Sequence, residues 1–220
     1  LMRRHEVRHL IVVNALGHVA GCIGAAATDA ANRQTDPEVR QIIEPVDVLV
    51  APNTPVLDVI ERLVASAWDL AVVVDRHQTP IGIVTEHDII GLASVMLHPD
   101  MRASRAATGA NITVRDTDTG GHALRQMIAH ELRHLVVVDE DGRLVGVISW
   151  RDVVRSRLTE TETRAIGHFL AAQPVQRVVL DSSLRIAAQR MHASKVGALP
   201  VLDEHGRPMW ILTRTDVMRA

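Results

Sequence analysis

Three pairs of polar residues share one spacing: a serine or threonine is followed, three residues later, by an aspartate. The pairs are Thr85 and Asp88, Ser149 and Asp152, and Thr213 and Asp216. A carboxylate can accept hydrogen bonds from both hydroxyls of a ribose, and the nearby hydroxyl adds a polar contact. Each pair follows a short apolar run and is predicted at a strand-to-helix junction, where free backbone N–H groups favour an anion. The pattern therefore suits a ribose-containing ligand.

The same spacing has a purely structural interpretation. A serine or threonine followed three residues later by an acid is also a capping box, which satisfies the free N–H groups at a helix start. A structural cap would recur in a repeated sequence just as a binding site would. Both interpretations stay open at this point.

Two stretches match the His-Glu-x-x-His pattern of zinc proteases, His5 to His9 and His130 to His134. That chemistry needs both imidazoles on one helix face, with the glutamate acting as general base. Here each second histidine abuts an apolar strand, so each pair straddles a helix end. We therefore expect no zinc hydrolase, no metal site and no catalytic residues.

The chain is built from repeats, which explain these recurrences. Gly82 and Gly146 are 64 residues apart, as are Asp152 and Asp216, and the apolar runs around them align without a gap. A partial copy opens the chain, in which Met2 aligns with Met127. Its first strand and most of its first helix are missing, so we expect the sequence to start inside a helix of a longer protein.

Each copy has the same order of expected elements: strand, helix, strand, strand, helix. A short β-rich stretch, 46–50 in copy two and 112–114 in copy three, precedes a helix. In the expected helix 56–64, the apolar residues fall on one face: Val56, Val59, Ile60, Leu63 and Val64. The apolar strands 135–138 and 144–148 flank a turn that contains Gly142. Strands this apolar are covered on both faces, so the copies should pack in pairs. Segments 28–44, 94–110 and 156–174 are expected linkers.

These residues resemble the CBS domain, named after cystathionine β-synthase. The resemblance rests on 123–127, on 133–135 and on the run from Gly146 to Asp152. It implies an α+β fold of tandem CBS motifs that pair into Bateman modules, often assembled as homodimers. The expected motifs are a degenerate first one at 1–30, a second at 44–98, a third at 108–158 and a fourth at 172–220.

The family also implies a ligand: AMP, ADP, ATP or S-adenosylmethionine, bound between paired motifs. The resemblance assigns ligand contacts to Thr85, Asp88, Ser149, Asp152, Thr213 and Asp216, and phosphate contacts to Arg133 and His134. The copies differ, however. Gly24 and Ala27 replace the hydroxyl and the carboxylate in copy one, and Trp210 replaces the motif glycine in copy four.

Composition narrows the function further. The net charge is -2, the pI is about 6.7 and aromatic residues are 2%, so no nucleic-acid surface is expected. Cys22 is the only cysteine, which excludes an internal disulfide. No apolar run reaches the ~18 residues needed to cross a bilayer, and the amino terminus has no signal-peptide core. We expect a soluble cytoplasmic protein without membrane contact.

Two functions remain. The first is a regulatory sensor that binds an adenosyl ligand, requires no cofactor and relays binding to a partner or a fused output domain. The second is a dimerisation scaffold without a small ligand, favoured by the degenerate first copy and by Trp210.

Overall fold

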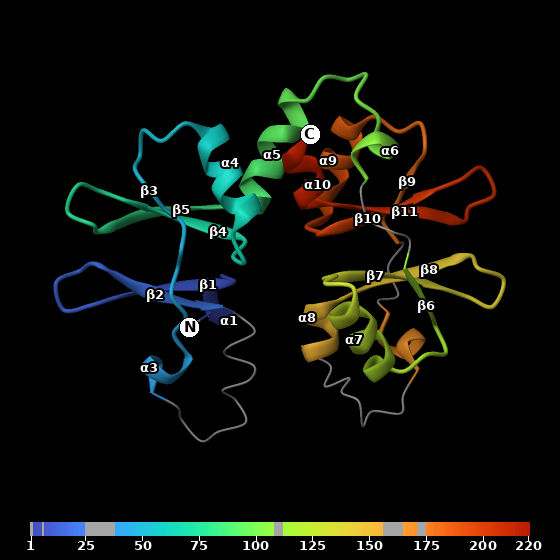
Figure 1. The fold of residues 1–220 in the computed structure, drawn as a ribbon, viewed down its shortest axis with the longest axis horizontal. Coiled ribbons are helices and arrows are strands. Elements are labelled where there is room, and N and C mark those ends of the chain that lie inside the picture. The colour runs from blue at the N-terminus through green and yellow to red at the C-terminus, as the bar shows by residue number, and fades with distance from the viewer. Residues whose placement is uncertain (1, 6, 25–37, 108–111, 156–164, 171–174) are drawn as a thin grey trace. The chain divides into compact units, whose positions relative to one another are not determined.

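The fold is described from a computed structural model, in which residues 2–5, 7–24, 38–107, 112–155, 165–170 and 175–220 are placed (Figure 1). Contacts divide the chain into two compact units, unit 1 (Leu1–Ile89) and unit 2 (Ile90–Ala220). Among the placed residues, no helix has the length and the apolar character to span a membrane.

Every full copy has the expected element order. Unit 1 contains α1 (Met2–His5), β1 (His9–Val13), β2 (Val19–Gly24), α3 (Val39–Ile42), β3 (Leu49–Val50), α4 (Val56–Ala65), β4 (Leu70–Val74), β5 (Pro80–Thr85) and the start of α5 (Glu86–Met96). Unit 2 contains the rest of α5, then α6 (Ala103–Ala106), β6 (Thr113–Arg115), α7 (Gly120–Ala129), β7 (His134–Val138), β8 (Leu144–Ser149), α8 (Trp150–Arg155), η1 (Ile166–Phe169), β9 (Val178–Val179), α9 (Leu184–Ser194), β10 (Ala198–Leu202), β11 (Pro208–Thr213) and α10 (Arg214–Arg219). The predicted strand, helix, strand, strand, helix order is confirmed in copies two, three and four.

Each full copy forms the same three-stranded sheet. The first long strand is central, with a short parallel strand on one side and its antiparallel hairpin partner on the other. The hairpins carry a register shift at the same place, between Val137 and Val138 in copy three. Gly142 occupies the hairpin turn with a φ of 76°, a conformation that glycine adopts without steric cost. The sequence repeat is therefore also a structural repeat.

Copies three and four pack sheet against sheet in unit 2. Val136 and Val138 of copy three form a buried cluster with Ala198 and Ile211 of copy four. Figure 1 shows the helices on the outer faces of these two sheets, with α7 and α8 on one side and α9 and α10 on the other. The central strands are covered on both faces, as predicted.

Copies one and two pair in unit 1. Cys22 of copy one is fully buried and clusters with Leu70, Val72 and Val74 of copy two. Pairing therefore holds in each unit, including the incomplete first copy.

The segments between copies are more than linkers. Three of them contain a helical turn (α3, α6 and η1), and Ser94, placed by the sequence in a linker, belongs to α5. Each of the three packs on the other copy of its pair rather than on the copy that it precedes. Ile166, which precedes copy four, is fully buried in the core of copy three with Val114, Ala123 and Met127.

The segment that precedes copy three packs in turn on copy four, and unit 1 has an equivalent contact. The amide of Leu184 at the start of α9 donates to the carbonyl of Met101, which precedes copy three, with an N–O distance of 2.7 Å. In unit 1, Cys22 and Glu44 exchange two backbone hydrogen bonds. We refer to 38–44, 98–107 and 165–170 as the crossing segments.

The predicted helix 56–64 is confirmed as α4, and burial varies along its apolar face. Val59 and Leu63 are buried, but Val56 is 45% exposed. Val56 is the first residue of α4.

Candidate ligand site

The three hydroxyl–carboxylate pairs lie where the sequence places them, each at the end of an antiparallel strand and the start of a helix. In copy two, the backbone amide and the hydroxyl of Thr85 both donate to Oδ2 of Asp88, at 2.9 and 2.7 Å. The amide of Asp88 in turn donates to the Thr85 hydroxyl at 3.4 Å. This is the reciprocal arrangement of a capping box.

Copies three and four repeat this geometry. Ser149 donates to Oδ2 of Asp152 from its amide at 3.0 Å and from its hydroxyl at 2.6 Å. Thr213 does the same to Asp216, at 2.8 and 2.7 Å. All of these bonds fall on Oδ2. These capping bonds therefore all use the same oxygen of each carboxylate.

The three carboxylates differ in exposure. Asp88 and Asp152 are exposed, whereas Asp216 is only 5% exposed. Asp216 lies on the wall of an open pocket of about 620 Å³ in unit 2, a size typical of small-molecule sites. The other pocket residues come from the crossing segment, from α9 and from the end of α10: His98, Asp100, Met101, Arg102, Arg105, Ala106, Leu184, Arg219 and Ala220. The pocket thus joins the carboxylate of copy four to a segment that precedes copy three.

The glycine of the motif has a different environment in each copy. A side chain at Gly146 would lie 2.8 Å from Cδ1 of Leu170, so the crossing segment occupies the space that the glycine leaves. At Gly82, a Cβ would meet Val73 at 3.9 Å, an ordinary van der Waals distance. In copy four the half-buried Trp210 stands opposite Val201 in the hairpin. The glycine of copy three therefore accommodates the protein's own packing.

Arg133 and His134 lie at the junction between copies three and four. His134 opens β7 and is the register partner of Ser149. Its ring packs against Gly197 of copy four, where an added Cβ would lie 2.8 Å from Nε2. Arg133 is exposed, and its carbonyl accepts a hydrogen bond from the amide of Trp150.

His134 is neutral at neutral pH. Burial of the imidazole lowers the pKa of His134 from 6.5 to about 4, and the positive charges of Arg214, Arg133 and Arg151 act in the same direction. Asp152 opposes them. His134 can therefore offer a ligand a neutral hydrogen-bonding group, while the positive charge at this junction comes from the arginines.

The zinc-protease pattern does not form a helical pair of ligands. Helix α7 ends at Ala129, His130 caps it, and Glu131 has a left-handed φ of 53°. His134 already belongs to β7. The predicted straddling of a helix end is confirmed for this stretch; Glu6 of the other stretch lies outside the described residues. Among the described residues, no group of three metal-ligating side chains comes together.

Comparison with known proteins identifies the family. The family model of the CBS domain matches residues 39–95, 96–159 and 167–220, which together are most of the chain. The chain belongs to the CBS-domain family. The resemblance inferred from the sequence is confirmed, as is the α+β fold of tandem CBS motifs.

Relatives and solved structures agree with this assignment. The uncharacterized protein MJ1404 of Methanocaldococcus jannaschii is 26% identical over 201 residues, 84% of this CBS protein and 47% of MJ1404. The chain thus spans about half the length of that relative. The crystal structure of MJ1225 from the same organism has a TM-score of 0.79 and an identity of 22%, covering 99% of this chain and 89% of that one, and therefore shares the fold.

One similar structure contains ligands. The CBS domain pair of protein MJ0100, in complex with 5′-methylthioadenosine and S-adenosyl-L-methionine, has a TM-score of 0.50 and an identity of 25%. The similarity covers 55% of this chain and 95% of that structure. The MJ0100 pair of CBS motifs therefore holds adenosyl ligands.

Sequence reasoning found the motif residues but missed their surroundings. Arg214 and Arg151 were not singled out, although both lie inside the hydroxyl–carboxylate motifs. Gly197 and the pocket residues Arg102, Arg105 and Arg219 were also missed. For Arg151 and Arg214 the signal was available, because a basic residue separates the two motif positions in copies three and four.

Proposed function

We propose that this CBS protein is a regulatory module that binds an adenosine-containing ligand between paired motifs. AMP, ADP, ATP and S-adenosylmethionine are the candidates. The observation that carries the proposal is the pocket in unit 2, whose wall combines the Asp216 carboxylate of copy four with the crossing segment that precedes copy three. The MJ0100 pair with its adenosyl ligands supports the ligand class.

The proposed contacts follow the motif. The carboxylates of Asp88, Asp152 and Asp216 accept hydrogen bonds from the ribose hydroxyls of the ligand. Thr85, Ser149 and Thr213 hold those carboxylates in place through the bonds described above. Arg133 and His134 contribute at the far end of the ligand, Arg133 as a cation and His134 as a neutral partner.

The regulatory role follows from the way the copies are joined. A ligand between two copies contacts both, so binding changes their packing if the two arrangements differ in affinity for it. The proposed output is a partner protein or a further domain, and the proposed assembly is a homodimer in the cytoplasm. We propose no catalytic activity, because the polar motifs act here as caps and ligand contacts.

A thermal-shift and calorimetric screen of the whole chain tests the proposal. A ligand at 100 times its Kd should stabilise the binding unit by about 2.7 kcal/mol, a rise in Tm of roughly 5–10 °C. Asp152→Asn and Asp216→Asn are matched variants, since asparagine keeps an oxygen for the cap but loses the charge. The sensor predicts weaker binding in at least one of them while the unliganded Tm stays nearly unchanged.

A ligand-free scaffold is the second candidate function, and the capping boxes favour it. They give all three aspartates a structural role without any ligand. For a scaffold, the screen gives no shift with any adenosyl compound, and replacing Thr213 or Ser149 by alanine costs only about 1 kcal/mol of stability.

A further inference from the structure

Crossing segments bind copies three and four at the same place, next to the residue that precedes the first helix of each copy. Each segment forms one isolated β-bridge there: Ala165 with Thr119 in copy three and Arg102 with Ser183 in copy four. The next amide of the segment donates to the carbonyl before the bridge: Ile166 to Asp118 at 2.8 Å and Ala103 to Ser182 at 2.9 Å. Ile166 and Ala103 are both fully buried, with 0% exposure. This place therefore accepts a short extended segment that has an apolar residue after the bridge.

Copy two has the same edge without a described segment on it. The 64-residue repeat makes Thr54 the counterpart of Asp118, and Val56 the counterpart of Leu184 in copy four. In copy four, the amide of Leu184 donates to the crossing segment at the carbonyl of Met101. Among the described residues, no backbone amide donates to the carbonyl of Thr54, and no backbone carbonyl accepts from the amide of Val56. Copy two therefore presents the acceptor and the donor that a bridge would use.

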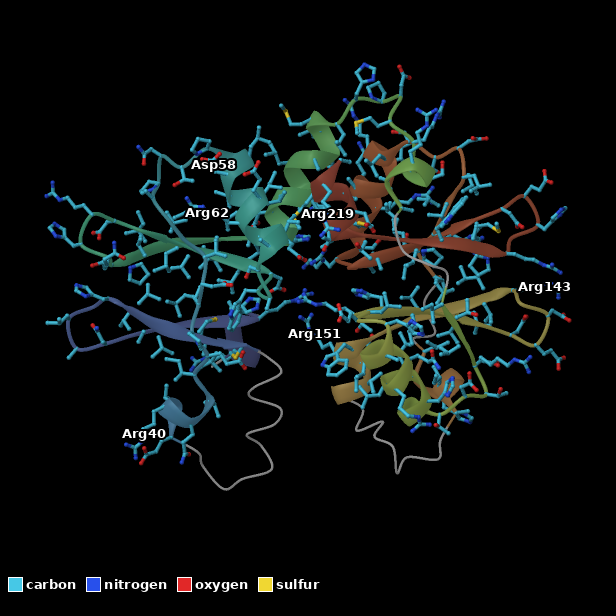
Figure 2. The ribbon with its side chains drawn as sticks, in the orientation of Figure 1. Arg40, Asp58, Arg62, Arg143, Arg151 and Arg219 are labelled. Carbon is cyan, nitrogen blue, oxygen red and sulfur yellow. The ribbon has the colours of Figure 1, made fainter. Side chains whose placement is uncertain are left out.

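The side chains at this edge of copy two are exposed. Val56 is 45% exposed, whereas the equivalent Leu184, which the crossing segment contacts, is 0% exposed. Leu57, the next residue of the same helix, is 72% exposed. Both belong to the start of α4, whose first and last turns carry Asp58 and Arg62 (Figure 2). Two aliphatic side chains thus lie uncovered where another copy has a crossing segment.

A hollow continues this edge along the backbone. In copy three, the amide of Gly167 in the crossing segment donates to the carbonyl of Asp116 at 2.8 Å. The counterpart of Asp116 in copy two is Pro52, which lines an open hollow of about 450 Å³ together with Ala51 and Asn53. The space beside Pro52 is therefore large enough for a further residue of an extended segment.

The motif glycine marks the far end of the path. In copies one and three it leaves room for a crossing segment, because an added Cβ would lie 2.7 Å from Ile43 at Gly21 and 2.8 Å from Leu170 at Gly146. The counterpart in copy two, Gly82, is exposed, and Ile81 beside it is 57% exposed. The groove of copy two, defined by 52–57 and 81–82, is thus open from the bridge position to the glycine.

We propose that this groove docks a peptide segment of a partner protein in the way that copies three and four hold their crossing segments. The peptide pairs with the Thr54 carbonyl and the Val56 amide, and the proline between them suits this bridge, which does not use its N–H. The residue after the bridge is apolar and covers Val56, and an aliphatic side chain four residues later lies over Gly82. The crossing segments of the described chain are engaged within their own units, so a second copy has none to offer. The docking proposal does not depend on the adenosyl ligand of the proposed function.

The experiment titrates the ¹⁵N-labelled full chain with the end-capped hexapeptide Ala-Ile-Gly-His-Phe-Leu, the sequence of 165–170, and follows amide chemical shifts by NMR. Val56→Asp places a charge under the peptide, yet an acid suits the first turn of a helix, so the variant should fold. Gly82→Leu fills the groove itself, and a Cβ there meets Val73 at an ordinary 3.9 Å. The matched control is Leu16→Ser, which replaces a leucine of copy one that is 77% exposed.

The peptide should bind the wild type with a Kd of about 1 mM or below, because two aliphatic side chains become buried. The shifts should fall on the amides of 54–57 and 81–83. Val56→Asp and Gly82→Leu should each weaken binding roughly tenfold, the loss expected for one buried aliphatic contact, whereas Leu16→Ser should bind as the wild type does.

Three outcomes overturn the proposal directly: no shift at millimolar peptide, shifts in the core of copy three instead, or equal affinity in the two groove variants. Shifts of the groove amides that depend on protein concentration, without peptide, would assign the groove to a second copy. Protection of these amides from hydrogen exchange in a chain extended ahead of Leu1 would assign it to the same chain. Either result also overturns docking of a partner.

Discussion

Acidification should destabilise unit 2 through His134. In the unfolded chain this imidazole has a pKa of 6.5, whereas in the fold burial and three arginines lower it to about 4. Between these values the unfolded state binds a proton that the folded state excludes, so stability falls as the pH falls. The contribution of His134 to the free energy of unfolding is fully present above pH 6.5 and is lost between pH 6.5 and 4.

The size of the effect follows from the two pKa values. The difference between the pKa values of 6.5 and about 4 corresponds to about 3 kcal/mol of unfolding free energy. About 2 kcal/mol of it is already lost at pH 5. For a small domain that is a large fraction of a typical stability of 5–15 kcal/mol. The loss should therefore be visible in an ordinary urea titration.

The assay compares urea unfolding at pH 7.5 and pH 5.0 for the wild type and for His134→Leu, a residue that copy two carries at the equivalent position as Leu70. Other groups titrate in both proteins, so the difference between the two pH dependences isolates His134. His205→Gln, in an exposed turn, is the control and should behave as the wild type. Equal pH dependence in wild type and His134→Leu, or a His134 pKa near 6.5 by NMR, would refute this reasoning.

Three further outcomes are expected. Burial raises the pKa of the Cys22 thiol to about 11, so alkylation of the native protein should be slow and should track unfolding of unit 1; rapid labelling at pH 8 would contradict this. Gly197→Ala should cost about 1–3 kcal/mol in thermal unfolding because its Cβ meets the His134 ring, and the cost should shrink in a His134→Ala background. Thr213→Ala should cost roughly 1 kcal/mol through the lost cap of α10, whereas Thr213→Ser should cost less; equal losses would argue against the cap.

Much of the fold was predictable because its signals are local and repeated. Each segment of the hairpin predicts its own conformation: the apolar run 135–138, the turn at Gly142 and the return strand. The same pattern recurs in the other copies, which supports each prediction. The hydroxyl–carboxylate pairs were found in the same way, since a three-residue spacing is visible in the sequence.

The remaining features depend on contacts between copies. Nothing near Ile166 indicates that its side chain fills the core of copy three, because the segment around it has no period of its own. Likewise, the meeting of His134 with Gly197 and Arg214 depends on how two sheets stack. Sequence alone could give His134 a position, but not the protonation state that its neighbours impose.

The crossing segments make each pair a single folding unit. The guanidinium of Arg102 donates to the carbonyl of Asp181, 79 residues away, and Ile166, which precedes copy four, fills part of the core of copy three. Such contacts of high sequence separation slow folding, since the chain loses the entropy of closing a long loop before the contacts form. An isolated copy would lack the surface on which its crossing segment packs. It would also lack the residues of the other copy that bury its core, so we expect that a single copy does not fold alone.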